Sequence, residues 1–251
     1  RNFEYLSEDP YLAGKLAAAF IRGQQSTGVS SSLKHFAANS QEYKRMNGDS
    51  RMDERTLREI YLAGFELAVK EGRPGTVMCA YNKINGVHCS DSKELLTDIL
   101  RDEWGFDGMV VTDWGALNDR ITAFQAGCDL NMPGGSRFME QAVAEAVKNG
   151  TLSEEAINAS VERILRLVEN TQQVKPTAVD FDAHHALART VAEQGAVLLK
   201  NAGGLLPLAT RDIVLIGHMA EKLRYQGSGS SHINPTRLVN LTDALPNAPF
   251  V

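Results

Sequence analysis

In the first two thirds of the chain, short runs of apolar residues alternate with longer segments in which apolar positions recur at helical spacing. The short runs predict buried strands at residues 29–33, 76–80, 109–112 and 128–132. The longer segments predict helices at residues 10–26, 53–71, 92–103, 116–125, 137–148 and 153–169. Strands and helices that alternate in this way are typical of α/β folds with a parallel sheet.

Polar and charged side chains gather where these predicted strands end. Lys34 and His35 follow the first strand, Tyr81 and Asn82 follow the second, and Asp113 follows the third. In parallel α/β folds, and in (β/α)8 barrels in particular, active sites form at the carboxyl ends of the strands. The pattern therefore predicts a cleft at this edge of the sheet, with Asp113 as its reactive acid.

The periodicity lapses after residue 170, and residues 171–180 resemble a linker. A second unit follows, with a helix predicted at residues 184–200 and a buried strand at residues 213–216. A Gly/Ser-rich loop at residues 227–231 lacks the lysine and the spacing of a phosphate-binding loop. The sequence thus predicts two units that differ in size.

Composition narrows the classes of partner. The net charge of -5 leaves no basic stripe for nucleic acid, and no apolar run reaches the roughly 20 residues of a membrane-spanning helix. We therefore expect neither nucleic acid nor a membrane as partner. Cys79, Cys89 and Cys128 follow no metal-ligand or paired spacing. They are predicted to be buried free thiols, which favours a reducing compartment such as the cytoplasm.

Four segments carry a further pattern that is collinear over nearly the whole chain. They are residues 1–10 (RNFEYLSEDP), 34–36 (KHF), 111–115 (VTDWG) and 197–201 (VLLKN). Together they resemble the β-glucosidases of glycoside hydrolase family 3. The resemblance implies a (β/α)8-type barrel joined by a linker to an α/β sandwich domain, with the sugar bound where the two meet.

A complete barrel takes about 250 residues, which is more than this chain has before the linker ends. The fold class expected is therefore α/β, as a partial (β/α)8-type barrel followed by the start of an α/β sandwich domain. We expect the latter part of the catalytic barrel in residues 1–170, the linker in residues 171–183 and the start of the sandwich in residues 184–251. On this interpretation the chain is an internal segment of a longer protein.

Carried over position by position, the resemblance makes Asp113 the catalytic nucleophile. The residues that it implies for binding the sugar are Arg1, Lys34, His35, Arg45, Met78, Tyr81, Trp114 and Ser230. Among these, the cationic residues would hold hydroxyl groups through charge-assisted hydrogen bonds, Trp114 would form a wall, and Ser230 would reach the sugar from the second domain. A retaining glycosidase needs an ionised carboxylate of this kind and a second carboxyl group about 5 to 5.5 Å away as acid.

Several of these residues are also compatible with a purely structural role. An Asp after a strand is often the cap of the next helix, and Met78 in a strand is more often core than pocket. Lys34 and His35 are compatible with a solvated strand end, and Arg45 lies in a charged segment where exposure is usual. The Gly/Ser-rich loop that holds Ser230 is compatible with a plain linker.

The function expected is that of a retaining, exo-acting β-glycosidase of β-glucosidase type that acts on β-linked glucosides or oligosaccharides. The Asp and His that provide the acid in the related N-acetylglucosaminidases do not follow Lys34-His35-Phe36, which favours a neutral hexose or pentose. No Glu of the chain matches the acid/base of the β-glucosidases, so that residue is expected beyond Val251. We expect no cofactor and no metal. The sequence leaves open whether the protein forms a homo-oligomer.

Two other function classes remain at this stage. A Schiff-base lyase of the aldolase kind would also place a lysine at the end of a barrel strand, and Lys34 qualifies. A non-catalytic sugar-binding protein is the third class. An acid/base residue distinguishes a glycosidase from a sugar-binding protein, because a binding protein does not need one.

Overall fold

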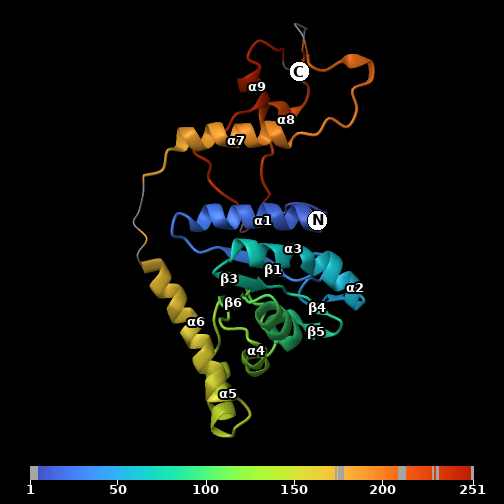
Figure 1. Cartoon of the computed structure of the whole chain (residues 1–251). Helices are drawn as coiled ribbons and strands as arrows, with labels where there is room; N and C mark the ends of the chain where they lie inside the picture. Colours follow the sequence, from blue (N-terminus) through green and yellow to red (C-terminus); the bar gives the residue numbers. More distant parts are fainter. Residues whose placement is uncertain are drawn as a thin grey trace. The chain divides into compact units, whose positions relative to one another are not determined.

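The computed structural model describes residues 5–172, 174, 178–208, 213–227, 229 and 232–249. The chain divides into two compact units, Arg1–Lys175 and Pro176–Val251. The first unit is built on a parallel sheet, and the described part of the second consists of helices and irregular segments (Figure 1). Among the described residues, no helix combines the length and the apolar character needed to cross a membrane.

A three-stranded parallel sheet forms the centre of the first unit. Its strands are β1 (Ser32–Phe36), β3 (Thr76–Cys79) and β6 (Met109–Thr112), in the order β1-β3-β6. Thr76 pairs with Met109 and Cys79 with Thr112, so β3 and β6 end together, and the pairing of β1 with β3 shifts between Leu33 and Phe36. A parallel sheet with intervening helices confirms the α/β class predicted from the sequence.

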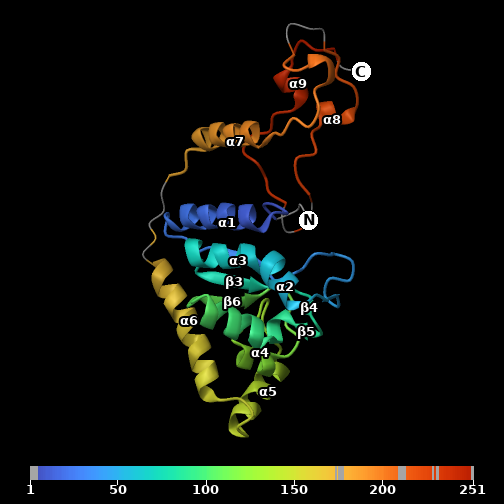
Figure 2. The ribbon, with the colours of Figure 1, turned by 45° about the vertical axis from the view of Figure 1, so that its right-hand side comes forward.

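Helical segments connect the strands in sequence order. The helices of the first unit are α1 (Pro10–Gln25), α2 (Glu54–Thr56), η1 (Leu57–Leu62), α3 (Ala63–Leu67), η2 (Ala68–Gly72), η3 (Cys89–Asp91), η4 (Glu94–Glu103), α4 (Arg120–Ala126), α5 (Arg137–Lys148) and α6 (Glu154–Gln172). Those from α2 to η2 form one continuous helical stretch in which η1 and η2 have the wider π-type turns, as predicted for residues 53–71. Helices α1 and α3 lie side by side (Figures 1 and 2).

The close contact between α1 and α3 depends on a small residue. A Cβ added to Gly14 would lie 2.7 Å from the Cβ of Leu67 and 2.9 Å from the carbonyl oxygen of Gly64. Neither distance leaves room for a side chain, so the two helices meet only because Gly14 has none. Asp9 fixes where α1 begins, because its carboxylate accepts hydrogen bonds from the backbone N–H groups of Tyr11 and Leu12.

A second, smaller sheet lies beside the ends of the main strands. It consists of β2 (Asp49–Ser50), β4 (Lys83–Ile84) and β5 (Val87–His88), in the order β2-β4-β5. Strands β4 and β5 form a hairpin whose turn residues, Asn85 and Gly86, both have positive φ. That combination is the type I′ turn, whose twist matches that of the flanking strands.

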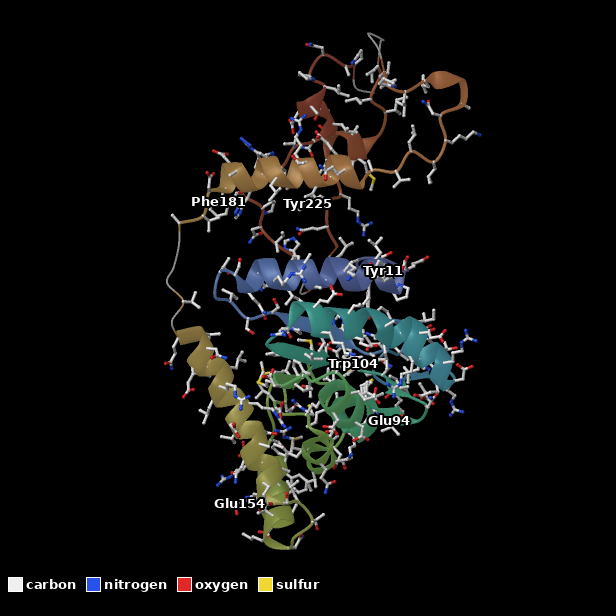
Figure 3. All side chains as sticks on the ribbon, viewed as in Figure 1. Tyr11, Glu94, Trp104, Glu154, Phe181 and Tyr225 are labelled. Carbon is white, nitrogen blue, oxygen red and sulfur yellow. The ribbon has the colours of Figure 1, made fainter. Side chains whose placement is uncertain are left out.

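Large apolar side chains fill the space between the sheet and its helices. Phe36 from β1 lies edge-on to Trp104, with ring centroids 5.8 Å apart, and to Phe65, with centroids 5.1 Å apart. Figure 3 labels Trp104 within this packed region. Leu96 and Leu100 from η4 are fully buried in the same cluster. The three cysteines are free and buried, as predicted.

A buried carboxylate ties α6 to the sheet. Asp129 has a fully buried side chain, and its Oδ2 lies 2.9 Å from Nη2 of Arg101, while its Oδ1 lies 2.8 Å from Nη1 of Arg163. The hydroxyl of Ser160 and the backbone N–H of Val110 also donate to it, at 2.9 and 2.7 Å. Burial lowers the pKa of the Arg101 guanidinium, and the Asp129 carboxylate opposes that effect. Two cations and two further donors thus compensate one buried charge.

Several predicted elements differ from the structure. The first strand lies at Ser32–Phe36 instead of residues 29–33, so Lys34 and His35 lie within it. The fourth helix begins at Arg120, four residues later than predicted, because Asp119 is its cap. The strand predicted at residues 128–132 is reduced to one parallel bridge between Val111 and Leu130. The regular ladder is interrupted because the N–H groups of Asp129 and Leu130 both donate to the carbonyl of Val110, while the N–H of Val110 donates to the Asp129 carboxylate.

The second unit contains α7 (Phe181–Gly195), η5 (Ala202–Gly204), α8 (His218–Glu221) and α9 (Leu241–Ala244). Helix α7 begins three residues earlier and ends five residues earlier than the helix predicted at residues 184–200. The buried strand predicted at residues 213–216 is wrong: only Leu215 is buried, and it donates its backbone N–H to Pro249. A strand is buried only where neighbouring strands and a second layer cover it, and this segment forms only a single β-bridge, at Leu215.

Candidate active site

Asp113 follows the last residue of β6, at the carboxyl edge of the parallel sheet. The backbone on both sides of it is fixed by neighbours. Its own N–H donates to the carbonyl of Cys79 in β3 at 3.2 Å, and the N–H of Gly115 donates to the carbonyl of Met132 at 2.8 Å. Gly115 has φ of +78°, a conformation that residues with a Cβ rarely adopt. The carboxylate is therefore carried by a rigid strand end and a constrained turn.

The two oxygens of the Asp113 carboxylate face different partners. Oδ1 accepts the backbone N–H of Trp114 at 2.6 Å, and Oδ2 lies 3.4 Å from Nε2 of His35. Both side chains are mostly buried, with 15% of Asp113 and 9% of His35 exposed. Asp113 is not the cap of the next helix, since Asp119 accepts the N–H of Thr122 there. The structural interpretation of Asp113 as a helix cap is thus wrong.

Tyr81 joins this pair from the end of β3. Its hydroxyl donates to the carbonyl of Trp114 at 2.9 Å, next to Asp113. Burial, followed by the charge of the Asp113 carboxylate and a hydrogen bond to it, raises the pKa of Tyr81 to about 12. The phenol therefore stays protonated at neutral pH and acts as a hydrogen-bond donor beside the carboxylate. The guanidinium of Arg45 lies over the Tyr81 ring, with Cζ 4.4 Å from the ring centroid.

The structure places the other predicted site residues as follows. Lys34 precedes His35 in β1 and is exposed, and Met78 is half-buried in β3 opposite Val111. Trp114 is 63% exposed, and the side chain of Arg45 forms an ion pair with Glu42 at 3.0 Å. Arg1 and Ser230 lie outside the described residues. The geometry thus brings His35, Tyr81 and Trp114 to Asp113, whereas Arg45 contacts the ring of Tyr81.

Sequence reasoning did not assign a role to four other residues near this edge. The Tyr5 ring lies 6.4 Å from that of His35, and Glu42 pairs with Arg45. Asn39 and Asn82 are buried and polar beside a small pocket. Asn82 directly follows Tyr81 at a strand end, which is the signal that could have singled it out. Across the described ranges, no group of three or more His, Cys, Asp or Glu side chains could hold a metal ion.

Comparison with known protein families decides the affiliation of the chain. Residues 1–167 match the model of the glycosyl hydrolase family 3 N-terminal domain. The chain belongs to glycosyl hydrolase family 3. Residues 196–249 match the model of the C-terminal domain of the same family. Both matches follow the order that the sequence motifs predicted.

Individual relatives give the same affiliation. The chain is 54% identical to thermostable β-glucosidase B of Acetivibrio thermocellus over 251 residues, which is 99% of this chain and 33% of that protein. It is 44% identical to an exo-α-(1→6)-L-arabinopyranosidase of Bifidobacterium longum, over 98% of this chain and 34% of that protein. The chain therefore spans about a third of the length of the curated relatives that it matches.

Solved structures confirm the fold class. The Bifidobacterium adolescentis family 3 β-glucosidase matches with a TM-score of 0.92 at 42% identity, over 99% of this chain and 37% of that one. β-Glucosidase 3B of Thermotoga neapolitana in complex with α-D-glucose matches with a TM-score of 0.92 at 39% identity, over 100% of this chain and 37% of that one. The parallel sheet and its helices thus form part of a (β/α)8-type barrel.

Proposed function

We propose that the protein carrying this chain is a retaining, exo-acting β-glucosidase in which Asp113 is the nucleophile. The observation that carries the proposal is the position of Asp113: a carboxylate at the carboxyl edge of a parallel sheet, with Oδ2 3.4 Å from His35 and the Tyr81 phenol beside it. The arrangement supports this role because it concentrates donors around one mostly buried carboxylate. Family membership favours a glycosidase over the Schiff-base lyase that Lys34 suggested.

The surroundings of Asp113 suit attack on an anomeric carbon. The carboxylate attacks as its anion, and the backbone N–H of Trp114 donates to it. The Tyr81 phenol lies beside it and donates its hydrogen to the carbonyl of Trp114. Attack forms a covalent glycosyl ester and expels the leaving group, and water then cleaves the ester with a second inversion. Arg45 and Lys34 supply cationic donors for the sugar hydroxyls, together with Arg1 and His35. Met78 and Trp114 would contribute apolar surface to the pocket, and Ser230 a hydroxyl from the second unit.

The acid that protonates the leaving oxygen is proposed to lie beyond Val251. In the domain organisation that follows, residues 1–170 supply the latter part of the catalytic barrel, residues 171–183 the linker and residues 184–251 the start of the sandwich domain. β-Linked glucosides are the proposed substrates, supported by the names of relatives such as β-glucosidase B. Because one relative is an arabinopyranosidase, activity on aryl glucosides should be compared first with activity on aryl arabinopyranosides.

Trapping of the covalent intermediate tests the proposal directly. An aryl 2-deoxy-2-fluoro-β-glucoside should inactivate the full-length enzyme, because fluorine slows both steps while a good leaving group lets the first proceed. Fragmentation of tryptic peptide 102–120 should place the label on Asp113. Proton NMR of the first product should show the β-anomer, since two inversions restore the configuration.

Two variants within the same peptide make this test specific. Asp113→Asn should abolish labelling and lower kcat by several orders of magnitude, since no other group can form the ester. Asp119→Asn removes the other carboxylate near the end of this peptide but keeps a side-chain oxygen as the cap of α4, so this variant should still be labelled at Asp113. A label on another carboxylate, or an α-anomer as first product, would show that the assignment is wrong.

A further inference from the structure

Thr112 is a polar residue at the end of an otherwise apolar strand. It is the last residue of β6, it directly precedes Asp113, and its side chain is fully buried. Valine has nearly the same branched shape and no polar atom in its side chain. A buried hydroxyl group costs free energy unless it is hydrogen-bonded. The partners of the Thr112 hydroxyl therefore indicate what this group contributes at a position that valine could fill.

The Thr112 hydroxyl binds the segment that follows α4. Its Oγ1 accepts the backbone N–H of Met132 at 2.9 Å. Oγ1 also lies 3.4 Å from the carbonyl oxygen of Met132 and 3.5 Å from Oδ1 of Asn131, and its single hydrogen serves one of these acceptors at a time. The backbone N–H of Thr112 donates to the carbonyl of Leu130 at 2.9 Å. The hydroxyl thus continues the attachment of this segment to β6 beyond the single bridge at Leu130.

Met132 also holds the chain on the other side of Asp113. Its carbonyl accepts the backbone N–H of Gly115 at 2.8 Å. Thr112 and Gly115 are therefore bound to the same residue, and Asp113 and Trp114 form the span between them. The N–H of Trp114 donates to Oδ1 of Asp113 at 2.6 Å, so a shift of this span moves a donor of the carboxylate. The orientation of the carboxylate thus depends on where Met132 lies.

We propose that the Thr112 hydroxyl positions the nucleophile: it fixes Met132, which in turn fixes the turn that carries Asp113. This inference rests on the proposed function and adds a positioning residue to it. Thr112 is fully buried, so it has no surface for contact with a sugar. The cationic residue Lys34 and its neighbour His35, which we propose as sugar ligands, lie on a different strand, β1. Loss of the hydroxyl should therefore slow attack by Asp113 and leave sugar binding unchanged.

The kinetics of inactivation by an aryl 2-deoxy-2-fluoro-β-glucoside separate these two effects in the full-length enzyme. The maximal rate constant at saturation reports attack by Asp113, and the half-saturating concentration reports reversible binding. Thr112→Val should lower the maximal rate constant about ten- to hundredfold, because a nucleophile displaced by about 1 Å loses rate on this scale. Its half-saturating concentration should equal that of the wild type. Thr112→Ser keeps the hydroxyl and should be inactivated at close to the wild-type rate.

Thr76→Val is the matched control, since it makes the same change in the neighbouring strand. Thr76 is buried at the start of β3, and its hydroxyl donates to the carbonyl of Ser31 at 3.2 Å, at the amino edge of the sheet. This variant should have a lower melting temperature and the wild-type maximal rate constant. That constant is first-order, so it does not depend on how much of a variant is folded. If Thr112→Val does not fold, Thr112→Ala replaces it and is compared with Thr112→Ser, from which it differs only by the hydroxyl.

The outcomes separate this inference from the proposed function. If the wild type is labelled at Asp113 and Thr112→Val reacts at the wild-type maximal rate, the inference is wrong and the proposed function stands. Equal slowing in Thr112→Ser would overturn it, because the hydroxyl would not be the cause. Equal slowing in Thr76→Val would also overturn it, because the sheet as a whole would have loosened. If the wild type is not labelled at Asp113, the proposed function fails and the inference falls with it.

Discussion

The two units of this chain differ in how much of their apolar surface is buried. In the first unit, Leu96 from η4 is fully buried against the sheet. In the second, Ile216 is 77% exposed, although its apolar neighbours predicted a buried strand. Both residues belong to clear hydrophobic patterns in the sequence. The difference shows that a pattern specifies which side chains can form a core, whereas the neighbouring elements decide whether they do.

The same contrast extends to polar groups. Asp129 in the first unit is fully buried and receives hydrogen bonds or ion pairs from Arg101, Arg163, Ser160 and Val110. In the second unit, the described ion pair between Arg237 and Asp182 spans 3.8 Å between largely exposed side chains. Exposed pairs contribute little to stability, and buried ones are costly to break. The comparison therefore predicts that sensitivity to mutation is concentrated in the first unit.

Removal of the buried carboxylate should have the largest effect on stability. Asp129→Ala leaves Arg101 buried without its counter-charge and should lower the free energy of unfolding by about 3 to 5 kcal/mol. Urea denaturation of the full-length protein measures this value. Asp182→Ala, which removes the exposed pair of the second unit, is the control and should change the free energy by less than about 0.5 kcal/mol. Equal effects would contradict the contrast.

Truncation of one apolar residue in each unit compares the two cores more directly. Leu96→Ala should lower the free energy of unfolding by about 3 kcal/mol, because it leaves a cavity beneath the sheet. Ile216→Ala removes a side chain that is largely in solvent, so a change below about 0.5 kcal/mol is expected. A large loss in Ile216→Ala would mean that further parts of the protein cover this position in the full-length molecule.

Replacement of Tyr81 should lower kcat less than replacement of the nucleophile Asp113. Tyr81→Phe removes one donor near the Asp113 carboxylate and should lower kcat about tenfold, which corresponds to about 1.4 kcal/mol. Because the pKa of Tyr81 is raised to about 12, the phenol is neutral throughout the usual assay range. The alkaline limb of the pH profile of kcat/KM should therefore be the same in the variant. A shift of that limb would show that Tyr81 titrates during turnover.

Much of the site could be predicted from the sequence, because its residues follow strand ends. The strand at Met109–Thr112 coincides with the prediction, and Asp113 follows it at the expected edge. The prediction for Lys34 and His35 was less accurate, since they lie inside β1. Ser31 accepts the backbone N–H of Thr76 and aligns β1 with β3, and this pairing is not visible in the sequence around residue 30. The roles given to individual site residues stay predictions.

Local sequence patterns were sufficient to predict the alternation of strands and helices, the parallel α/β class and the position of the acid after β6. These properties depend on local periodicity and on residues adjacent in the chain. The folded structure was needed to establish that His35 faces Oδ2 of Asp113, that Asp129 is a buried anchor and that Asn39 and Asn82 line one pocket. Those contacts join residues from different strands and helices. Their distances depend on strand register and helix packing, which no single segment of the sequence specifies.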